Sequence, residues 1–140
     1  MTLADARNRT PPESLPKLSP EEYSLLWHCG FWDGPTDGML SYRGGEFWFE
    51  TIQENETVEE GQWYRRYAVV RLAPEQLERE HNVHEDFRRY VGTHSDYVAA
   101  QQGEQGLRPK EQWHHFYDEH LDYCRSRRFE ESEVIGWFEL

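Results

Sequence analysis

Two segments with helical periodicity each carry an ionisable side chain inside an apolar stripe. Winding residues 74–91 at 100° per residue places Glu80 and His84 in the same sector as the apolar positions of that helix. His120 lies in the middle of the apolar stripe of a second helix, and His94 and Asp96 follow the first one. Imidazole and carboxylate groups that meet in a cleft can transfer protons or ligate a metal. The pattern predicts Glu80, His84, His94, Asp96 and His120 as catalytic candidates of a His-dependent hydrolase or metal enzyme.

A structural role explains the same residues and is the favoured interpretation. Glu80 and His84 are four residues apart and could bond each other, His120 could bond a backbone carbonyl or a Tyr hydroxyl, and His94 could cap a loop. The sequence has no phosphate loop, dinucleotide glycine motif, nucleophile elbow or zinc-protease His pair. It therefore leans away from an enzyme, indicates no dedicated metal site and leaves any cofactor unknown.

A turn-rich segment flanked by aromatic residues provides a second candidate site. Residues 32–38 read Trp-Asp-Gly-Pro-Thr-Asp-Gly, a run that favours a tight, ordered loop. We expect a pocket between this loop and a sheet, in which Trp rings stack on a small ligand and an Arg side chain forms an ion pair with a negative group of that ligand. Packing of the same rings in the core is the favoured alternative. The candidate ligand-binding residues are Trp32, Asp33, Asp37, Trp48, Arg65 and Arg71.

The charge balance points to a third function. The chain has 27 acidic and 15 basic residues, with a formal net charge of −12. Such a surface repels phosphate backbones and anionic membranes, so no nucleic-acid or membrane partner is expected. It attracts basic macromolecules, although solubility alone also accounts for it. The leading hypothesis is a small acidic binding or inhibitor-type domain, in the manner of immunity or antitoxin proteins, with a basic protein as its partner.

The cellular location is predicted from cysteines and from missing export signals. Cys29 and Cys124 are the two cysteines, and they form no paired motif. The sequence begins without a signal-peptide pattern and has no apolar run long enough to span a bilayer. We expect reduced thiols and a cytoplasmic protein.

The elements that would position these residues indicate an α+β fold. Residues 39–43 and 46–53 predict a β-hairpin around Gly44-Gly45, with residues 63–72 as a third strand and 134–140 as a last one. Helices are predicted from Pro74 to about Val91 and from Lys110 to about Arg125. The expected architecture is a mainly antiparallel sheet of about four strands, packed by two long helices, with the hairpin at its centre.

The hairpin prediction includes a pairing register. The predicted pairs place Leu40, Tyr42, Phe47 and Phe49 on the core face and leave Trp48 partly exposed on the other. They are Arg43 with Glu46, Tyr42 with Phe47, Ser41 with Trp48, and Leu40 with Phe49.

A domain boundary is predicted before the hairpin. Proline-rich residues 1–18 predict a disordered lead-in, and residues 19–140 predict a single domain. Ser19 to Glu22 favours a short helix, with a strand from Tyr23 to Trp27 as the alternative.

Overall fold

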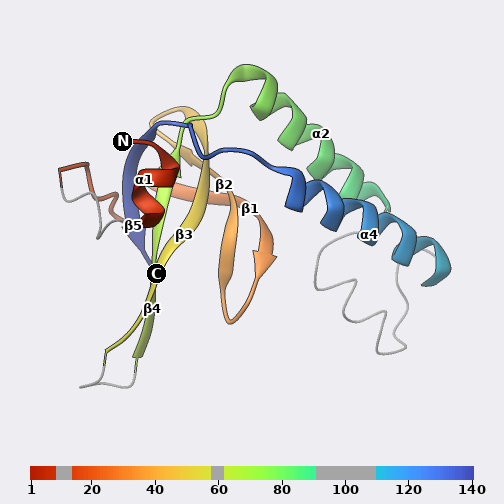
Figure 1. Cartoon of the computed structure of the whole chain (residues 1–140), viewed down its shortest axis with the longest axis horizontal. Coiled ribbons are helices and arrows are strands. Elements are labelled where there is room, and N and C mark those ends of the chain that lie inside the picture. Colours follow the sequence, from red (N-terminus) through yellow and green to blue (C-terminus); the bar gives the residue numbers. More distant parts are fainter. Residues whose placement is uncertain (9–13, 58–61, 91–109) are drawn as a thin grey trace. The chain divides into compact units, whose positions relative to one another are not determined.

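The computed structural model describes residues 1–8, 14–57, 62–90 and 110–140. They form two compact units, which we call the sheet unit, Met1–Ala73 with Arg128–Leu140, and the helical unit, Pro74–Arg127. An antiparallel sheet in one unit and long helices in the other make this an α+β protein, as predicted (Figure 1). The packing of those helices on the sheet stays a prediction.

The sheet has five strands where the sequence predicted about four. The strands are β1 Tyr23–Phe31, β2 Pro35–Tyr42, β3 Gly45–Thr57, β4 Gln62–Val70 and β5 Val134–Glu139. They follow each other in the order β1-β2-β3-β4-β5, and every neighbouring pair is antiparallel. The extra strand is β1, which replaces the expected short helix after Ser19 and confirms the alternative interpretation of a strand from Tyr23 to Trp27. The capping chemistry is present, because the Ser19 amide donates to the Glu22 carboxylate at 2.9 Å, but it closes a single turn before the strand starts.

The hairpin between β2 and β3 exists, but its turn lies one residue earlier than predicted, which moves every pairing partner on β3 by two residues. Arg43 and Gly44 occupy the turn, with φ of 49° and 76°, so Tyr42 pairs with Gly45 and Leu40 with Phe47. A two-residue hairpin turn of this kind needs positive φ at both positions. Gly45 starts β3, where an added Cβ would lie 3.0 Å from the Phe47 ring. The predicted core face is nevertheless confirmed, since moving the turn by one residue changes the partners but not the face.

The sheet curls so strongly that its two edge strands approach each other. Tyr23 of β1 and Phe138 of β5 have ring centroids 4.5 Å apart, although three strands separate them in the sheet. Residues 16–18 fill the gap beside β5: the Leu18 amide donates to the Trp137 carbonyl at 2.8 Å, and the Trp137 amide to the Pro16 carbonyl at 3.1 Å. The curl therefore encloses an aromatic core. Its buried members are Leu18, Leu40, Tyr42, Phe47, Phe49, Tyr67, Val69 and Phe138.

The other face of the sheet is also covered, which corrects the expectation for Trp48. Its side chain is 1% exposed, and the Phe129 ring lies edge-on against it at 5.4 Å. Helix α1, Leu3–Asn8, packs on β3 and β4 and buries Leu3 and Ala6. Because both faces are buried, the central strands carry apolar residues at successive positions.

The first 18 residues differ from the expected disordered lead-in wherever the structure describes them. Residues 1–8 contain α1, whose first turn is capped by reciprocal bonds between Thr2 and Asp5 at 3.1 and 3.2 Å. The Val134 amide donates to the Met1 carbonyl at 2.9 Å, and Leu18 belongs to the aromatic core. The low overall hydrophobicity of this segment concealed a few well-placed apolar side chains. Residues 9–13 lie outside the described residues.

The helical unit consists of α2, Pro74–Tyr90, and α4, Lys110–Ser126, which contact each other and run antiparallel (Figure 1). Both agree with the predicted helices to within a residue at each end. Within the described parts of the chain, no helix has the length and apolar character needed to cross a membrane.

Gly136 allows residues 16–18 to approach β5, so a side chain there should oppose closure of the sheet. A Cβ on Gly136 would lie 2.6 Å from Leu18 Cδ1 and 2.9 Å from the Pro16 carbonyl oxygen. We expect Gly136→Ala to lower the free energy of unfolding by about 1–3 kcal/mol, measured by urea denaturation. Gly44→Asn is the control, because nothing lies within 4 Å of its added Cβ and Asn tolerates positive φ. Equal stability of the two variants would contradict the proposed role of Gly136.

Candidate functional site

The described residues contain a pocket at one end of the curled sheet. Its volume is about 470 Å³, and it lies among the turn between β1 and β2, strands β3 and β4, and Leu140. This range of volume is typical of small-molecule sites, and the mouth of a curled sheet is a common place for one. Three of the predicted ligand-binding residues, Trp32, Asp33 and Arg65, line it.

Arg65 holds the turn that forms one wall of the pocket. Its guanidinium donates to the carbonyl of Gly34 at 3.0 Å and to the carbonyl of Trp32, while Nε donates to Glu54 at 2.8 Å. Glu54 lies directly opposite Arg65 in the pairing of β3 with β4. The side chain is only 12% exposed. Arg65 is thus neutralised by Glu54 and most of its donors are used within the protein, which differs from the predicted role of answering a negative ligand.

The same turn holds Trp32 and Asp33 in a defined backbone conformation. The Trp32 amide donates to the Gly34 carbonyl at 2.8 Å, and Asp33 has a φ of 50°, a left-handed value that Asp tolerates. Although its backbone is bonded on both sides, the Trp32 residue is 74% exposed. Because the backbone of this exposed indole is already held, it has little backbone freedom left to lose on binding.

Tyr67 connects the pocket to the aromatic core. Its hydroxyl donates to the Pro35 carbonyl at 2.6 Å, and its ring stacks on Phe138 with centroids 4.7 Å apart. Burial raises the pKa of the Tyr67 hydroxyl, so the group stays protonated and keeps donating across the physiological pH range. The shape of the pocket is therefore supported from inside the sheet.

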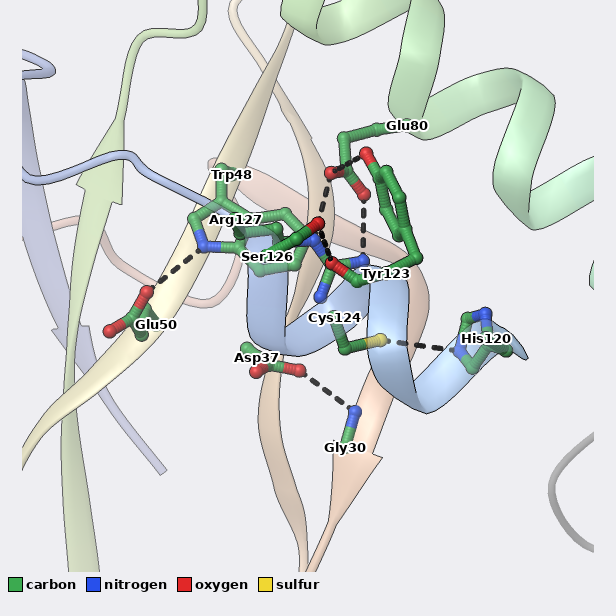
Figure 2. Close-up of polar contacts among 10 residues, drawn as sticks. All are labelled: Gly30, Asp37, Trp48, Glu50, Glu80, His120, Tyr123, Cys124, Ser126 and Arg127. Atoms are coloured by element: carbon green, nitrogen blue, oxygen red, sulfur yellow. Dashed lines mark hydrogen bonds and ion pairs between the residues drawn. The ribbon is translucent and has the colours of Figure 1, made fainter. Parts of the chain in front are cut away.

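The other three predicted ligand-binding residues lie elsewhere in the sheet unit. Asp37 accepts a bond from the Gly30 amide at 2.8 Å, and Trp48 is a core residue whose Nε1 donates to Glu50 at 3.3 Å (Figure 2). Arg71 pairs with Glu133 at 3.5 Å. The loop hypothesis located the pocket but included residues whose side chains serve the fold.

In the helical unit, Glu80 belongs to a buried ion pair. Figure 2 shows its carboxylate between Arg127, which donates to both oxygens at 2.8 and 2.9 Å, and the hydroxyl of Tyr123 at 2.7 Å. Glu80 is 1% exposed. Desolvation, followed by the bond to Glu80, raises the pKa of Tyr123. These contacts replace the expected Glu80–His84 bond and occupy the group proposed as a catalytic acid or base.

The remaining catalytic candidates are only partly described. His120 Nε2 lies 3.5 Å from Cys124 Sγ, and its ring packs against Phe87 at 4.4 Å. Burial lowers the pKa of His84 to about 4, with Arg88 and His81 adding to the shift, so this imidazole is neutral at pH 7. His94 and Asp96 lie outside the described residues. The structure therefore places Glu80 and His120 in different local contacts and leaves the five-residue constellation a prediction.

Several residues of these sites were missed at the level of sequence. Glu54, Tyr64 and Tyr67 line the pocket, and their positions depend on the register of β3 with β4. The alternation of Arg65 and Tyr67 along one strand was an available signal, because residues two apart share a face. The His120–Cys124 contact likewise follows the four-residue spacing of a helix.

Among the described residues, no group of three or more His, Cys, Asp or Glu side chains is placed to hold a metal ion. The fold is that of an α+β protein, and its curled antiparallel sheet has a pocket at one end. Comparison of the chain with protein-family models, curated proteins and solved structures finds no match.

Breaking the buried ion pair should destabilise the helical unit strongly. Arg127→Met leaves the Glu80 carboxylate buried without its counter-charge, and we expect a loss of about 3–5 kcal/mol in unfolding free energy. Far-UV circular dichroism in urea measures it. Arg125→Met is the matched control, since its pair with Asp122 is 3.9 Å long and 75% and 80% exposed. That variant should lose less than about 1 kcal/mol, and a similar loss in both would contradict a structural role for Glu80.

The lowered pKa of His84 predicts a pH-dependent stability. The unfolded imidazole protonates near pH 6.5 and the folded one near pH 4, so the unfolded state binds more protons between these values. The stabilisation from His84 is fully present above pH 6.5 and is lost as the pH falls towards 4. Urea unfolding of His84→Gln should show a weaker pH dependence in this window than the native chain. Identical slopes would contradict the burial of a neutral His84.

Proposed function

We propose that this protein is a non-catalytic binding protein of the inhibitor type, and that its partner is a basic macromolecule. The observation that supports this is the charge of the sheet unit. It contains 16 of the 27 acidic residues but 8 of the 15 basic ones, a formal net charge of −8. The same unit contains the pocket.

The basic side chains of the sheet unit are largely engaged within it. Seven of its eight basic residues lie in the described ranges, and five of these each pair with a carboxylate of the same unit. They therefore serve the fold more than they attract anionic partners. These pairs are Arg7–Glu50, Lys17–Glu139, Arg65–Glu54, Arg66–Glu139 and Arg71–Glu133. The remaining acidic excess gives the unit a negative field, which speeds encounter with a basic partner and weakens with salt.

The hydrolase hypothesis has less support. Its acid, Glu80, is held by Arg127 and Tyr123, and a carboxylate with two such partners has little freedom to exchange protons with a substrate. His84 and His120 retain the chemistry of imidazole, and their part in catalysis stays a prediction.

A small-ligand sensor is the second candidate function. The pocket favours it, because a volume of about 470 Å³ beside an exposed indole suits a small planar or cationic molecule. In this function, the acidic surface would only keep the protein soluble, and the pocket alone would recognise the ligand.

Salt-dependent capture tests the proposed binding function. Immobilised protein is incubated with a cell extract at low ionic strength, and bound proteins are eluted with increasing salt and identified by mass spectrometry. We expect a specific basic protein that is retained at low salt and released as screening increases, because surface charges lose their attraction beyond about 10 Å at 0.1 M salt. An unrelated acidic protein of equal net charge is the control. If the chain retains nothing that this control does not also retain, the proposed function is wrong.

A further inference from the structure

Arg65, the basic residue of the pocket wall, already uses most of its hydrogen-bond donors within the protein. Arg65 gives its Nε to Glu54 and both terminal nitrogens to carbonyl groups of the turn. A bidentate contact to a carboxylate or phosphate requires two adjacent N–H groups of one guanidinium, and both such edges already carry bonds here. The pocket is therefore poorly suited to an anion.

The same wall is well suited to a cation. Asp33 and Glu54 give it two carboxylates against the single charge of Arg65, and Trp32, Tyr64 and Tyr67 add aromatic rings. The negative faces of such rings attract guanidinium and ammonium groups, indole most strongly. The charge of −8 on the sheet unit favours cations around the pocket as well.

Trp32 is the part of the pocket most available to a partner. Cations already stack on other rings of the sheet unit, with Arg66 5.4 Å and Lys17 5.0 Å from the Trp137 ring. Within the described parts of the chain, no cation lies over Trp32, which is 74% exposed. Exposed Trp residues on rigid backbone are typical anchors of protein interfaces.

We infer that this pocket binds an arginine side chain of the basic partner, with the guanidinium stacked on Trp32 and paired with the carboxylate of Asp33. The inference rests on the proposed binding function and adds the chemical group that the partner presents. Arginine is preferred to lysine because its planar group stacks on aromatic rings and is more weakly hydrated. The volume of about 470 Å³ leaves room for the aliphatic stem and neighbouring atoms of the partner. The expected sign of the ligand is thus positive, opposite to the sequence-based prediction.

Nuclear magnetic resonance of the full chain tests this directly. The probe is the blocked tripeptide Gly-Arg-Gly, and the control probe carries uncharged citrulline in place of arginine. The chain has six Trp residues, so the indole N–H signal of Trp32 is assigned from its loss in Trp32→Phe. We expect the signals of the Trp32 indole and the Gly34 amide to shift saturably with the arginine peptide, and to stay in place with the citrulline peptide.

Matched variants separate the pocket from the general acidic surface. Asp33→Asn should weaken the arginine peptide about two- to fivefold, as removal of one exposed counter-charge does. Glu131→Gln removes the same charge from an exposed position outside the pocket lining and should leave the affinity unchanged. Equal effects of the two variants, or equal shifts with citrulline, would overturn the inference.

The results also distinguish this inference from the proposed function. Salt-sensitive capture of a basic protein without any shift at Trp32 overturns the arginine seat and leaves the binding function standing. If ethylguanidinium shifts Trp32 but neither the peptide nor a basic protein binds, the pocket is a site for free small cations, and the inference is overturned together with the proposed function.

Discussion

The sheet unit depends on the packing of aromatic rings inside its curl. Phe138 stacks on Tyr67 with planes 10° apart and also contacts Tyr23, so one side chain joins β5 to its neighbour β4 and to the opposite edge strand. A flat sheet of these strands would leave the rings exposed to water, at a cost of about 25 cal/mol per Å² of apolar area. The curl, the position of residues 16–18 beside β5 and the open end that forms the pocket all follow from this packing.

Both units use an arginine to neutralise a glutamate and to connect separate segments. Arg65 joins β4 to Glu54 of β3 and to the turn after β1, and Arg127 joins the end of α4 to Glu80 of α2. Bidentate or multiple bonds of this kind need the planar fork of arginine, which lysine lacks. The acidic excess of the chain therefore coexists with arginines that are committed to the fold, and each of these two arginines is neutralised by a glutamate of its own unit.

The sequence was informative where periodicity and turn chemistry act locally. The bounds of α2 and α4, the hairpin and its core face agree with the structure, because each follows from spacing within one segment. The errors concern contacts between distant segments. Residues 1–8 and 16–18 are ordered by β-sheet partners more than a hundred residues away, and Trp48 is buried by Phe129. The hairpin register was ambiguous because both turns place the same residues on the core face.

For the candidate sites, local reasoning located the loop that lines the pocket but not the hydrogen-bond partners of its charged residues. Arg65 was predicted to be available, whereas its partners come from a loop some thirty positions earlier and from the neighbouring strand. Glu80 was expected to bond its helical neighbour His84, yet its partners are Tyr123 of α4 and Arg127, which follows α4. A polar residue in an apolar stripe predicts that a partner exists, but only the tertiary fold decides which one.

The bond from the Tyr67 hydroxyl to the Pro35 carbonyl couples the pocket to the core, because the same Tyr67 ring stacks on Phe138. The turn cannot open far without disturbing a ring that is stacked on Phe138. Occupancy of the pocket should then stabilise the entire sheet unit by mass action, by about 2.7 kcal/mol at a hundredfold excess of ligand over its dissociation constant. A rise in melting temperature would thus indicate that a ligand is bound, so thermal unfolding can be used to screen compounds for ligands of the pocket.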